Sequence, residues 1–168
     1  FETSGSTGSR VRILHDRRSL LANIAYGERE RAVITRLVGR ESGYREVRLG
    51  YAGGTLDKVY DFYRDHTWIP SRPQRLELSV TDPLAHNVEA INAFAPDILF
   101  GYGSYLHAIA RAAAAGRIAL KRPKLVIYAA EPLSLAARQE IEDALGAPVI
   151  SRYTAVEAFK IAYLCEKR

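Results

Sequence analysis

Residues 3–10, TSGSTGSR, have the composition of a loop that binds phosphate. Their glycines let backbone N–H groups converge on an anion, and their hydroxyls add further donors. The stretch does not fit the Walker pattern, because Gly8 is followed by Ser9 and Arg10 rather than by lysine, and it contains no GxGxxG. It therefore predicts an anion-binding loop of another kind, with an ordinary flexible terminus rich in Ser, Gly and Thr as the alternative.

Three later stretches with chemistry-bearing residues each follow an apolar run that predicts a strand. GYGS at 101–104 follows DILF, AAEP at 129–132 follows KLVIY, and YTAVE at 153–157 follows PVIS. In open α/β sheets, ligands bind outside the carboxyl ends of the strands. All three stretches therefore satisfy the geometric condition for a ligand site.

Predicted strands and helices alternate along the chain. Apolar spacing predicts helices over 17–39, 56–68, 85–94, 104–116 and 135–146, and strands over 11–14, 44–52, 74–80, 97–102, 124–132, 147–154 and 160–166. We expect Asp82 to cap a helix that has Pro83 at its first position, and Ser134 and Gly146 to bound the last helix. Gly27 weakens the first helix, and AVITRLV at 32–38 alone also fits a strand.

This alternation predicts an α/β fold with a largely parallel, twisted sheet and helices on both faces. The 168 residues are 48% apolar, enough for one domain with a sizeable core. The net charge of +5 is spread over both halves, which argues against a nucleic-acid partner. The single Cys165 excludes an internal disulfide framework, and we expect it to be buried. No apolar run of membrane-spanning length and no signal pattern occurs, so we expect no membrane association and a cytoplasmic location.

The order of three stretches, TSGSTG, PDILFGYGSYL and AAEP through the final EKR, carries a resemblance over nearly the whole chain. The sequence resembles the N-terminal domain of the adenylate-forming superfamily, specifically the phenylacetate–coenzyme A ligase branch. The resemblance implies ATP-dependent activation of a carboxylic acid as an acyl-adenylate, followed by transfer to coenzyme A or another thiol. ATP, Mg²⁺ and coenzyme A are the implied ligands, and an aromatic acid is the usual substrate.

The resemblance also assigns site residues. The phosphate loop falls on Thr3, Ser4, Gly5, Ser6, Thr7 and Gly8, the adenine-side segment on Ala129, Ala130, Glu131 and Pro132, and the Y-G-x-T-E motif on Tyr153, Thr154, Ala155, Val156 and Glu157. Tyr153 is expected to pack on adenine and Glu157 to hold Mg²⁺, with Thr7 and Glu157 as the catalytic pair. Tyr102, Gly103 and Ser104 are expected beside the acyl pocket, which Phe100 and Tyr105 also could line.

Departures and alternatives remain open. Thr154 stands where the family has glycine, Val156 where it has a hydroxyl, and Arg10 where it has proline or lysine. Taken singly, Tyr153 fits a rim aromatic, Glu131 the end of a strand, and Glu157 the start of a helix.

Three hypotheses follow for the chain as a whole. The first is the core of a longer ligase, suggested by Phe1 and by the lack of the family's ribose-binding aspartate and C-terminal lid domain. Such a core is expected to self-associate, for instance as a homodimer. The second is a non-catalytic nucleotide-binding or interaction module, and the third is an unrelated hydrolase-like domain, against which the missing GxSxG counts.

Overall fold

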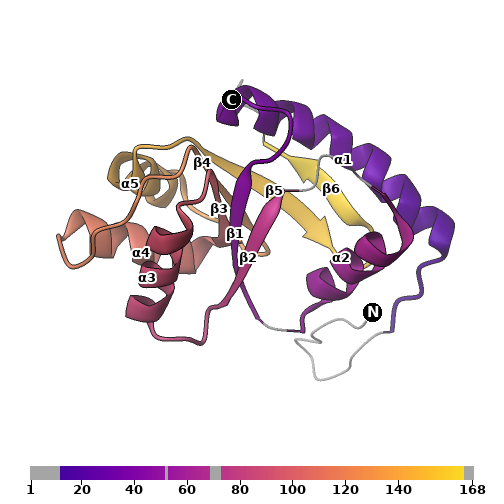
Figure 1. The fold of residues 1–168 in the computed structure, drawn as a ribbon, viewed down its shortest axis with the longest axis horizontal. Helices are drawn as coiled ribbons and strands as arrows, with labels where there is room; N and C mark the ends of the chain where they lie inside the picture. Colours follow the sequence, from indigo (N-terminus) through magenta and orange to yellow (C-terminus); the bar gives the residue numbers. More distant parts are fainter. Residues whose placement is uncertain (1–11, 52, 69–72, 165–168) are drawn as a thin grey trace.

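The computed structural model describes residues 12–51, 53–68 and 73–164, which form one six-stranded sheet covered by helices (Figure 1). The elements in chain order are α1 (Arg17–Val38), β1 (Arg45–Gly50), α2 (Thr55–His66), β2 (Gln74–Ser79), α3 (Leu84–Phe94), β3 (Ile98–Tyr102), α4 (Gly103–Ala114), β4 (Leu125–Ala129), α5 (Leu135–Leu145), β5 (Val149–Ala155) and β6 (Phe159–Tyr163). The strand order is β2-β1-β3-β4-β5-β6. All neighbours from β2 to β5 pair in parallel, and β6 pairs antiparallel with β5.

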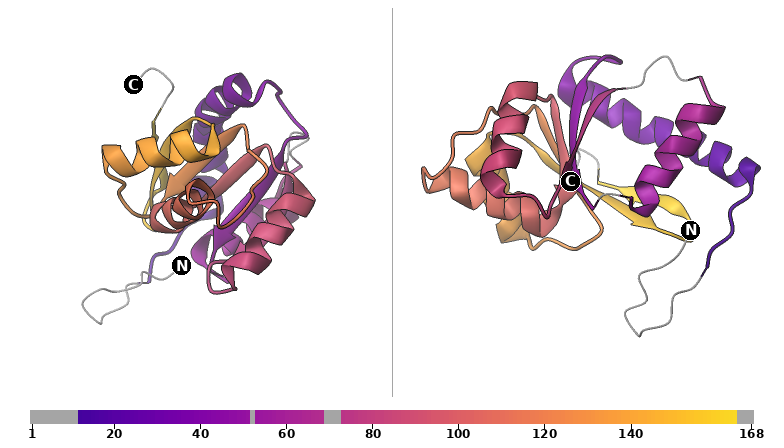
Figure 2. Two further views of the ribbon diagram at one scale, coloured as in Figure 1. Left: turned by 90° about the vertical axis from the view of Figure 1, so that its left-hand side faces the viewer. Right: turned by 60° about the horizontal axis from the view of Figure 1, so that its bottom comes forward.

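Helices lie on both faces of the sheet, as predicted. α3, α4 and α5 cover one face, whereas α1 and α2 lie on the other (Figures 1 and 2). The first face packs its core around Leu49, Leu99 and Val126 of the strands and Ile109 of α4. The second face packs around residues of α1, β3, β4 and β5, and a smaller cluster joins α1, α2 and β6. The predicted α/β fold is therefore confirmed.

The composition of the strands reflects the helix layers on the two faces of the sheet. β3 and β4 are buried on both faces, so their residues form continuous apolar runs. β1 alternates instead: Val47 and Leu49 join the core beneath α3 to α5, while Glu46 and Arg48 point to the face that α1 and α2 share. The charged side of this strand is buried, because α2 lies over it.

Local capping signals predicted some helix ends well. The Ser134 hydroxyl accepts a hydrogen bond from the Ala137 N–H at 3.1 Å and opens α5, and Gly146 closes it at φ 63°. The first helix runs unbroken from Arg17 to Val38, so the strand alternative for residues 32–38 is wrong.

Three boundary predictions are also wrong. Of the strand predicted over 11–14, residues 13 and 14 are loop, and Arg12 lies in an isolated bridge. α3 begins at Leu84 with Pro83 as its N-cap residue. Asp82 belongs instead to the preceding turn, in which its N–H donates to the Ser79 carbonyl. α4 ends at Ala114, ahead of the predicted Gly116. Cys165 lies outside the described residues.

Candidate functional site

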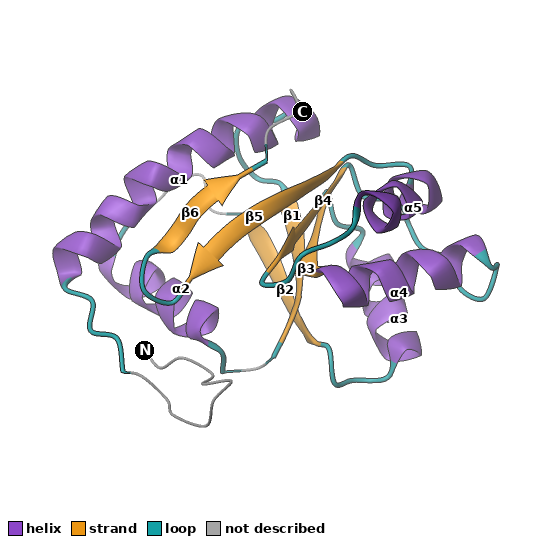
Figure 3. Ribbon diagram, turned by 180° about the vertical axis from the view of Figure 1, so that it is seen from behind, coloured by secondary structure: helices purple, strands orange, loops and turns teal. Residues whose placement is uncertain are grey.

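The three predicted site segments lie at one edge of the sheet, where β3, β4 and β5 end (Figure 3). β3, β4 and β5 are adjacent and parallel, and they are in register near their carboxyl ends: Tyr102 pairs with Ala129, and Ala129 pairs with Arg152, from which β5 continues to Ala155. The segments 102–104 and 129–132 therefore leave the sheet side by side, and residues 153–155 extend past them as the end of β5, paired with β6. Parallel strands present this edge to ligands in open α/β folds.

Glu131 links two of these segments. Its Oε1 accepts a hydrogen bond from the Ser104 N–H at 2.5 Å, at the start of α4. A carboxylate at this position satisfies one of the unpaired N–H groups of the helix and interacts favourably with the helix dipole. Glu131 thus holds the loop after β4 against the start of α4, a structural contact that sequence reasoning missed.

The turn from β3 into α4 requires glycine because its neighbours are close. A Cβ added at Gly103 would lie 2.7 Å from Leu133 Cγ, closer than real Cβ contacts. Burial raises the pKa of the neighbouring Tyr102 hydroxyl, and Tyr51, Glu131 and Asp57 act in the same direction. Tyr102 is therefore neutral at physiological pH and acts there as a hydrogen-bonding aromatic group.

The loop after β4 contains a strained residue. Ala130 is exposed and has φ 71°, in the left-handed region that L residues other than Asn and Asp rarely adopt. Such a conformation costs on the order of 1–2 kcal/mol and is typical of functional sites.

Tyr153 and Glu157, from the third segment, are both exposed. Tyr153 is 63% exposed near the end of β5, and Glu157 lies in the turn at 156–158 that connects β5 to β6. Thr154 has no positive φ, so threonine replaces the family's glycine without backbone strain. A register shift between Tyr153 and Thr154 bends the strand at this point.

The phosphate loop, residues 3–8, lies outside the described residues, so Thr3, Ser4, Gly5, Ser6, Thr7 and Gly8 are not placed relative to these segments. Within the described ranges, no three His, Cys, Asp or Glu side chains are grouped to hold a metal ion. Mg²⁺ commonly uses one or two carboxylates together with substrate phosphates and water. Glu157, an exposed carboxylate, fits that single-carboxylate role.

A cavity of about 1200 Å³ opens at the same edge and extends between the sheet and helices α1 and α2. Tyr102, Ala130 and Thr154 line it where the strands end, and Tyr51 faces Tyr102 edge-on with 5.6 Å between ring centroids. Phe100 lines it more deeply. Aromatic side chains thus line the cavity where it opens at the sheet edge.

Two residues that the sequence associated with the acyl pocket have other contacts. Ser104 donates to Glu131 at the start of α4. Tyr105 packs on the opposite face, where its hydroxyl accepts a hydrogen bond from Asn87 Nδ2 at 2.8 Å.

Charged side chains also line this cavity, and sequence reasoning did not predict them. We call this set of residues the charged layer. It consists of Glu30, Glu46, Arg48, Arg75, Glu77, Arg152 and Lys160. Arg48 bonds Glu77 at 2.9 Å and Arg75 bonds Glu46 at 3.2 Å, in both cases between β1 and β2. The sequence signal that could have predicted these pairs is the opposite order of the charges in the two strands, Glu then Arg in β1 and Arg then Glu in β2.

Tyr60 of α2 packs on the charged layer. Its ring centroid lies 4.5 Å from the Arg48 guanidinium and 4.2 Å from that of Arg75, distances typical of cation–π contacts. Burial acts to raise the pKa of its hydroxyl, but Arg152, Arg75 and Arg48 outweigh it and lower the pKa below its ordinary value. α2 is thus attached to the sheet by charge as well as by apolar contact.

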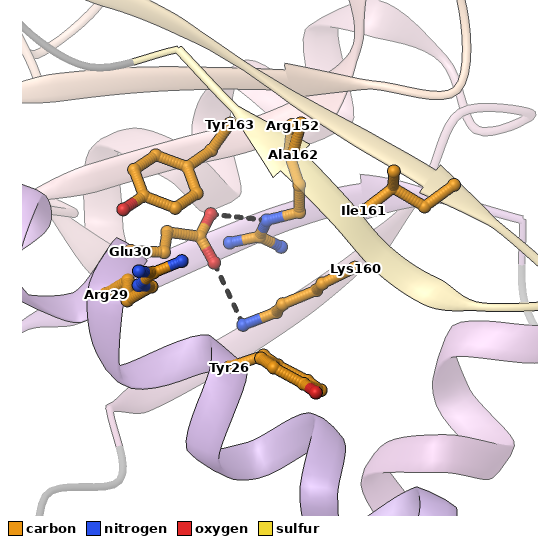
Figure 4. Close-up of a pocket in the computed structure, with 8 residues that line it drawn as sticks. All are labelled: Tyr26, Arg29, Glu30, Arg152, Lys160, Ile161, Ala162 and Tyr163. Carbon is orange, nitrogen blue, oxygen red and sulfur yellow. Dashed lines mark hydrogen bonds and ion pairs between the residues drawn. The ribbon is translucent and has the colours of Figure 1, made fainter.

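The other end of the charged layer joins α1 to β5 and β6 (Figure 4). Glu30 is 2% exposed and accepts from Arg152 Nε at 2.5 Å and from Lys160 Nζ at 2.9 Å. Burial acts to lower the pKa of Arg152, but Glu30 and Tyr60 raise it above its ordinary value. Gly27 makes the second contact possible, since a Cβ there would lie 2.9 Å from Lys160 Nζ.

Three of the four histidines have partners within the described residues. His107 Nε2 lies 2.6 Å from Glu140 Oε2 between α4 and α5, and His66 Nδ1 lies 3.0 Å from the Phe62 carbonyl. His15 Nε2 bonds the Val156 carbonyl at 2.8 Å. Ser4, whose contact with a histidine would have favoured a hydrolase, lies outside the described residues. No helix within the described ranges is long and apolar enough to cross a membrane.

No family model and no curated protein matches the sequence. Solved structures do match. An amide bond synthetase, McbA from Marinactinospora thermotolerans, superposes with a TM-score of 0.68 at 20% identity over 98% of this chain and 30% of its own. A 2-hydroxyisobutyryl-CoA ligase in complex with 2-HIB-AMP and CoA gives 0.66 at 18% identity over 99% and 35%. A malonyl-CoA ligase with methylmalonyl-CoA and AMP bound gives 0.63 at 17% identity over 99% and 34%.

The chain therefore spans about a third of the length of these structures. The similar proteins are enzymes of the adenylate-forming superfamily. At identities of 20% and below, it is the TM-scores of 0.63 to 0.68 that establish a shared fold. The described residues, 12–51, 53–68 and 73–164, have the fold of part of the N-terminal domain of adenylate-forming enzymes.

Proposed function

We propose that this chain is the nucleotide- and acid-binding core of an enzyme that activates a carboxylic acid with ATP and passes it to coenzyme A or another thiol. The observation that carries the proposal is the convergence of segments 102–104, 129–132 and 153–157 at one sheet edge. The family resemblance assigns acyl, adenine and magnesium contacts to these same three segments. The similar solved structures, among them ligases holding AMP or an acyl-AMP, support it.

In the proposed reaction, a carboxylate oxygen of the acid attacks the α-phosphorus of ATP. The new P–O bond forms as the bond to the pyrophosphate leaving group breaks, which gives acyl-adenylate and pyrophosphate. Residues 3–8 would hold the β and γ phosphates through backbone N–H groups and hydroxyls. Mg²⁺, held through Glu157 and the phosphates, would supply charge neutralisation.

Tyr153 is the proposed adenine contact. Its ring is 63% exposed, so it offers a free face for a base to stack on, next to the loop that contains Ala130 and Glu131. Base–aromatic stacking contributes about 1–3 kcal/mol per base.

The acid would occupy the cavity beneath Tyr51 and Tyr102. These two and Phe100 are among the aromatic side chains that line it. This lining favours an aromatic acid, in keeping with the phenylacetate–coenzyme A ligase branch, and coenzyme A is the proposed acceptor.

ATP–pyrophosphate exchange on the protein that contains this chain tests the proposal, with a panel of aromatic and aliphatic carboxylic acids. We expect exchange that depends on one class of acid and is lost in Tyr153→Ala and Glu157→Gln. Glu140→Gln, on the outer side of α5 beside His107, is the matched carboxylate control and should retain exchange. Acid-independent exchange, or full activity in both site variants, would refute the assignment.

A non-catalytic nucleotide-binding module is the second candidate. Val156 motivates it, because a valine side chain cannot donate the hydrogen bond that the family's hydroxyl makes to the α-phosphate. ATP binding by calorimetry without exchange for any acid would favour this candidate. Restoring the hydroxyl with Val156→Thr should then raise nucleotide affinity if the site is otherwise intact.

A further inference from the structure

The turn at 156–158 is held by side chains from a distant part of the chain. His15 Nε2 lies 2.8 Å from the Val156 carbonyl oxygen, and because a carbonyl only accepts, the imidazole donates. Asn23 Nδ2 of α1 reaches the Ala158 carbonyl at 3.5 Å, at the limit of hydrogen-bonding distance. Both contacts link the turn that bears Glu157 to residues just downstream of the phosphate loop.

The His15 ring also supports a strained residue. It packs on Phe159 with ring centroids 4.2 Å apart and an interplanar angle of 34°. Phe159 is 7% exposed and has φ 54°, a conformation that bulky residues keep only when their surroundings impose it. The imidazole thus contacts both the carbonyl of the turn and the residue that begins β6.

His15 is itself placed by the start of α1. The next residue, Asp16, caps the helix: its Oδ1 accepts from the Ser19 N–H at 2.6 Å. Further along, the same helix is attached to β5 and β6 by the buried Glu30 pair (Figure 4). α1 and the residue before its cap are therefore attached to the β5–β6 hairpin at two points, His15 and Glu30.

We infer that His15 is a positioning residue that fixes the turn carrying Glu157 to the start of α1. Its effect on turnover rests on the proposed function, because Glu157 is the group that it would hold in place. The inference about the turn itself does not need turnover.

Two substitutions separate the hydrogen bond from the ring contact. His15→Phe keeps an aromatic ring against Phe159 but removes the donor, whereas His15→Ala removes both. His86→Ala, an exposed histidine on α3, is the matched control. Amide hydrogen–deuterium exchange of peptides covering residues 155–159 reports on the turn without requiring activity.

We expect exchange in this peptide to become about fivefold faster in His15→Phe, corresponding to one lost hydrogen bond, and faster still in His15→Ala. Peptides of β3 and β4 should be unchanged in both, and His86→Ala should match the wild type throughout. Unchanged exchange at 155–159 in both His15 variants would overturn the inference.

ATP–pyrophosphate exchange supplies the second readout. In an active protein we expect His15→Phe to raise the KM for Mg·ATP severalfold and lower kcat, with the KM for the acid unchanged. Loss of protection in the turn with both parameters for ATP unchanged would overturn the positioning role. If the wild type shows no ATP–pyrophosphate exchange with any acid, the proposed function fails. The hydrogen–deuterium exchange of residues 155–159 then supports or overturns the contact between His15 and the turn by itself.

Discussion

Replacing Glu30 with glutamine is expected to destabilise the protein by about 3–5 kcal/mol, the usual cost of removing one partner from a buried ion pair. The carboxylate is 2% exposed and bonds Arg152 at 2.5 Å and Lys160 at 2.9 Å. Arg152 is only 8% exposed, so the variant leaves its guanidinium buried without a counter-charge. Against a typical total of about 5–15 kcal/mol, this loss is large.

The effect should depend on pH in a defined direction. Burial acts to raise the pKa of Glu30, but Arg152 and Lys160 outweigh it and lower the pKa below the ordinary value of 4.5. A carboxyl whose pKa is depressed on folding contributes stability above its unfolded pKa and loses that contribution as pH falls through its folded pKa. The difference between wild type and Glu30→Gln should therefore be full at pH 7 and shrink below about pH 4.5.

Urea unfolding followed by circular dichroism at pH 7 and at several acidic pH values measures both effects. Glu28→Gln is the control, because Glu28 is an exposed partner of Arg31 on the same helix and its loss should cost about 0.2–1 kcal/mol. A cost for Glu30→Gln no larger than for Glu28→Gln, or a difference that persists unchanged in acid, would refute the argument that this buried pair stabilises the hairpin.

Three further outcomes follow from single contacts. A Cβ at residue 27 would lie 2.9 Å from the Lys160 ammonium. Gly27→Ala should therefore stabilise the protein by about 1 kcal/mol through helix propensity only when Lys160→Met has removed that ammonium. A double-mutant cycle in urea measures this coupling. Gly103→Ala should lower the free energy of unfolding by about 1–3 kcal/mol because its Cβ would overlap Leu133. Leu133→Ala should relieve that loss, and thermal unfolding of the single and double variants measures both effects. Tyr153→Ala should change stability by less than about 0.5 kcal/mol because the ring is exposed, yet weaken ATP binding on the order of tenfold in calorimetry; equal binding would exclude adenine stacking.

Much of the secondary structure could be predicted because its causes are local. Ser134 and Gly146 bound α5 as expected, since a hydroxyl cap and a left-handed glycine act within one turn of the helix. The cap predicted at Asp82 was wrong because that residue's N–H bonds the end of β2, a local competition that composition does not reveal.

The sequence by itself determined the alternation of strands and helices, and with it the α/β class and the place of the three site segments directly after β3, β4 and β5. These features depend on apolar periodicity and on the geometry of parallel strands, both of which are visible along the chain.

Only the tertiary structure decided which distant residues meet. It placed β6 antiparallel beside β5, buried Glu30 against Arg152, and brought His15 to the carbonyl of Val156. It also showed that Gly27, an unfavourable residue within a helix, lies where the Lys160 side chain passes to reach Glu30. The contacts of Glu30 with Arg152 and of His15 with Val156 depend on packing between segments more than 100 residues apart, which no local pattern of residue types encodes.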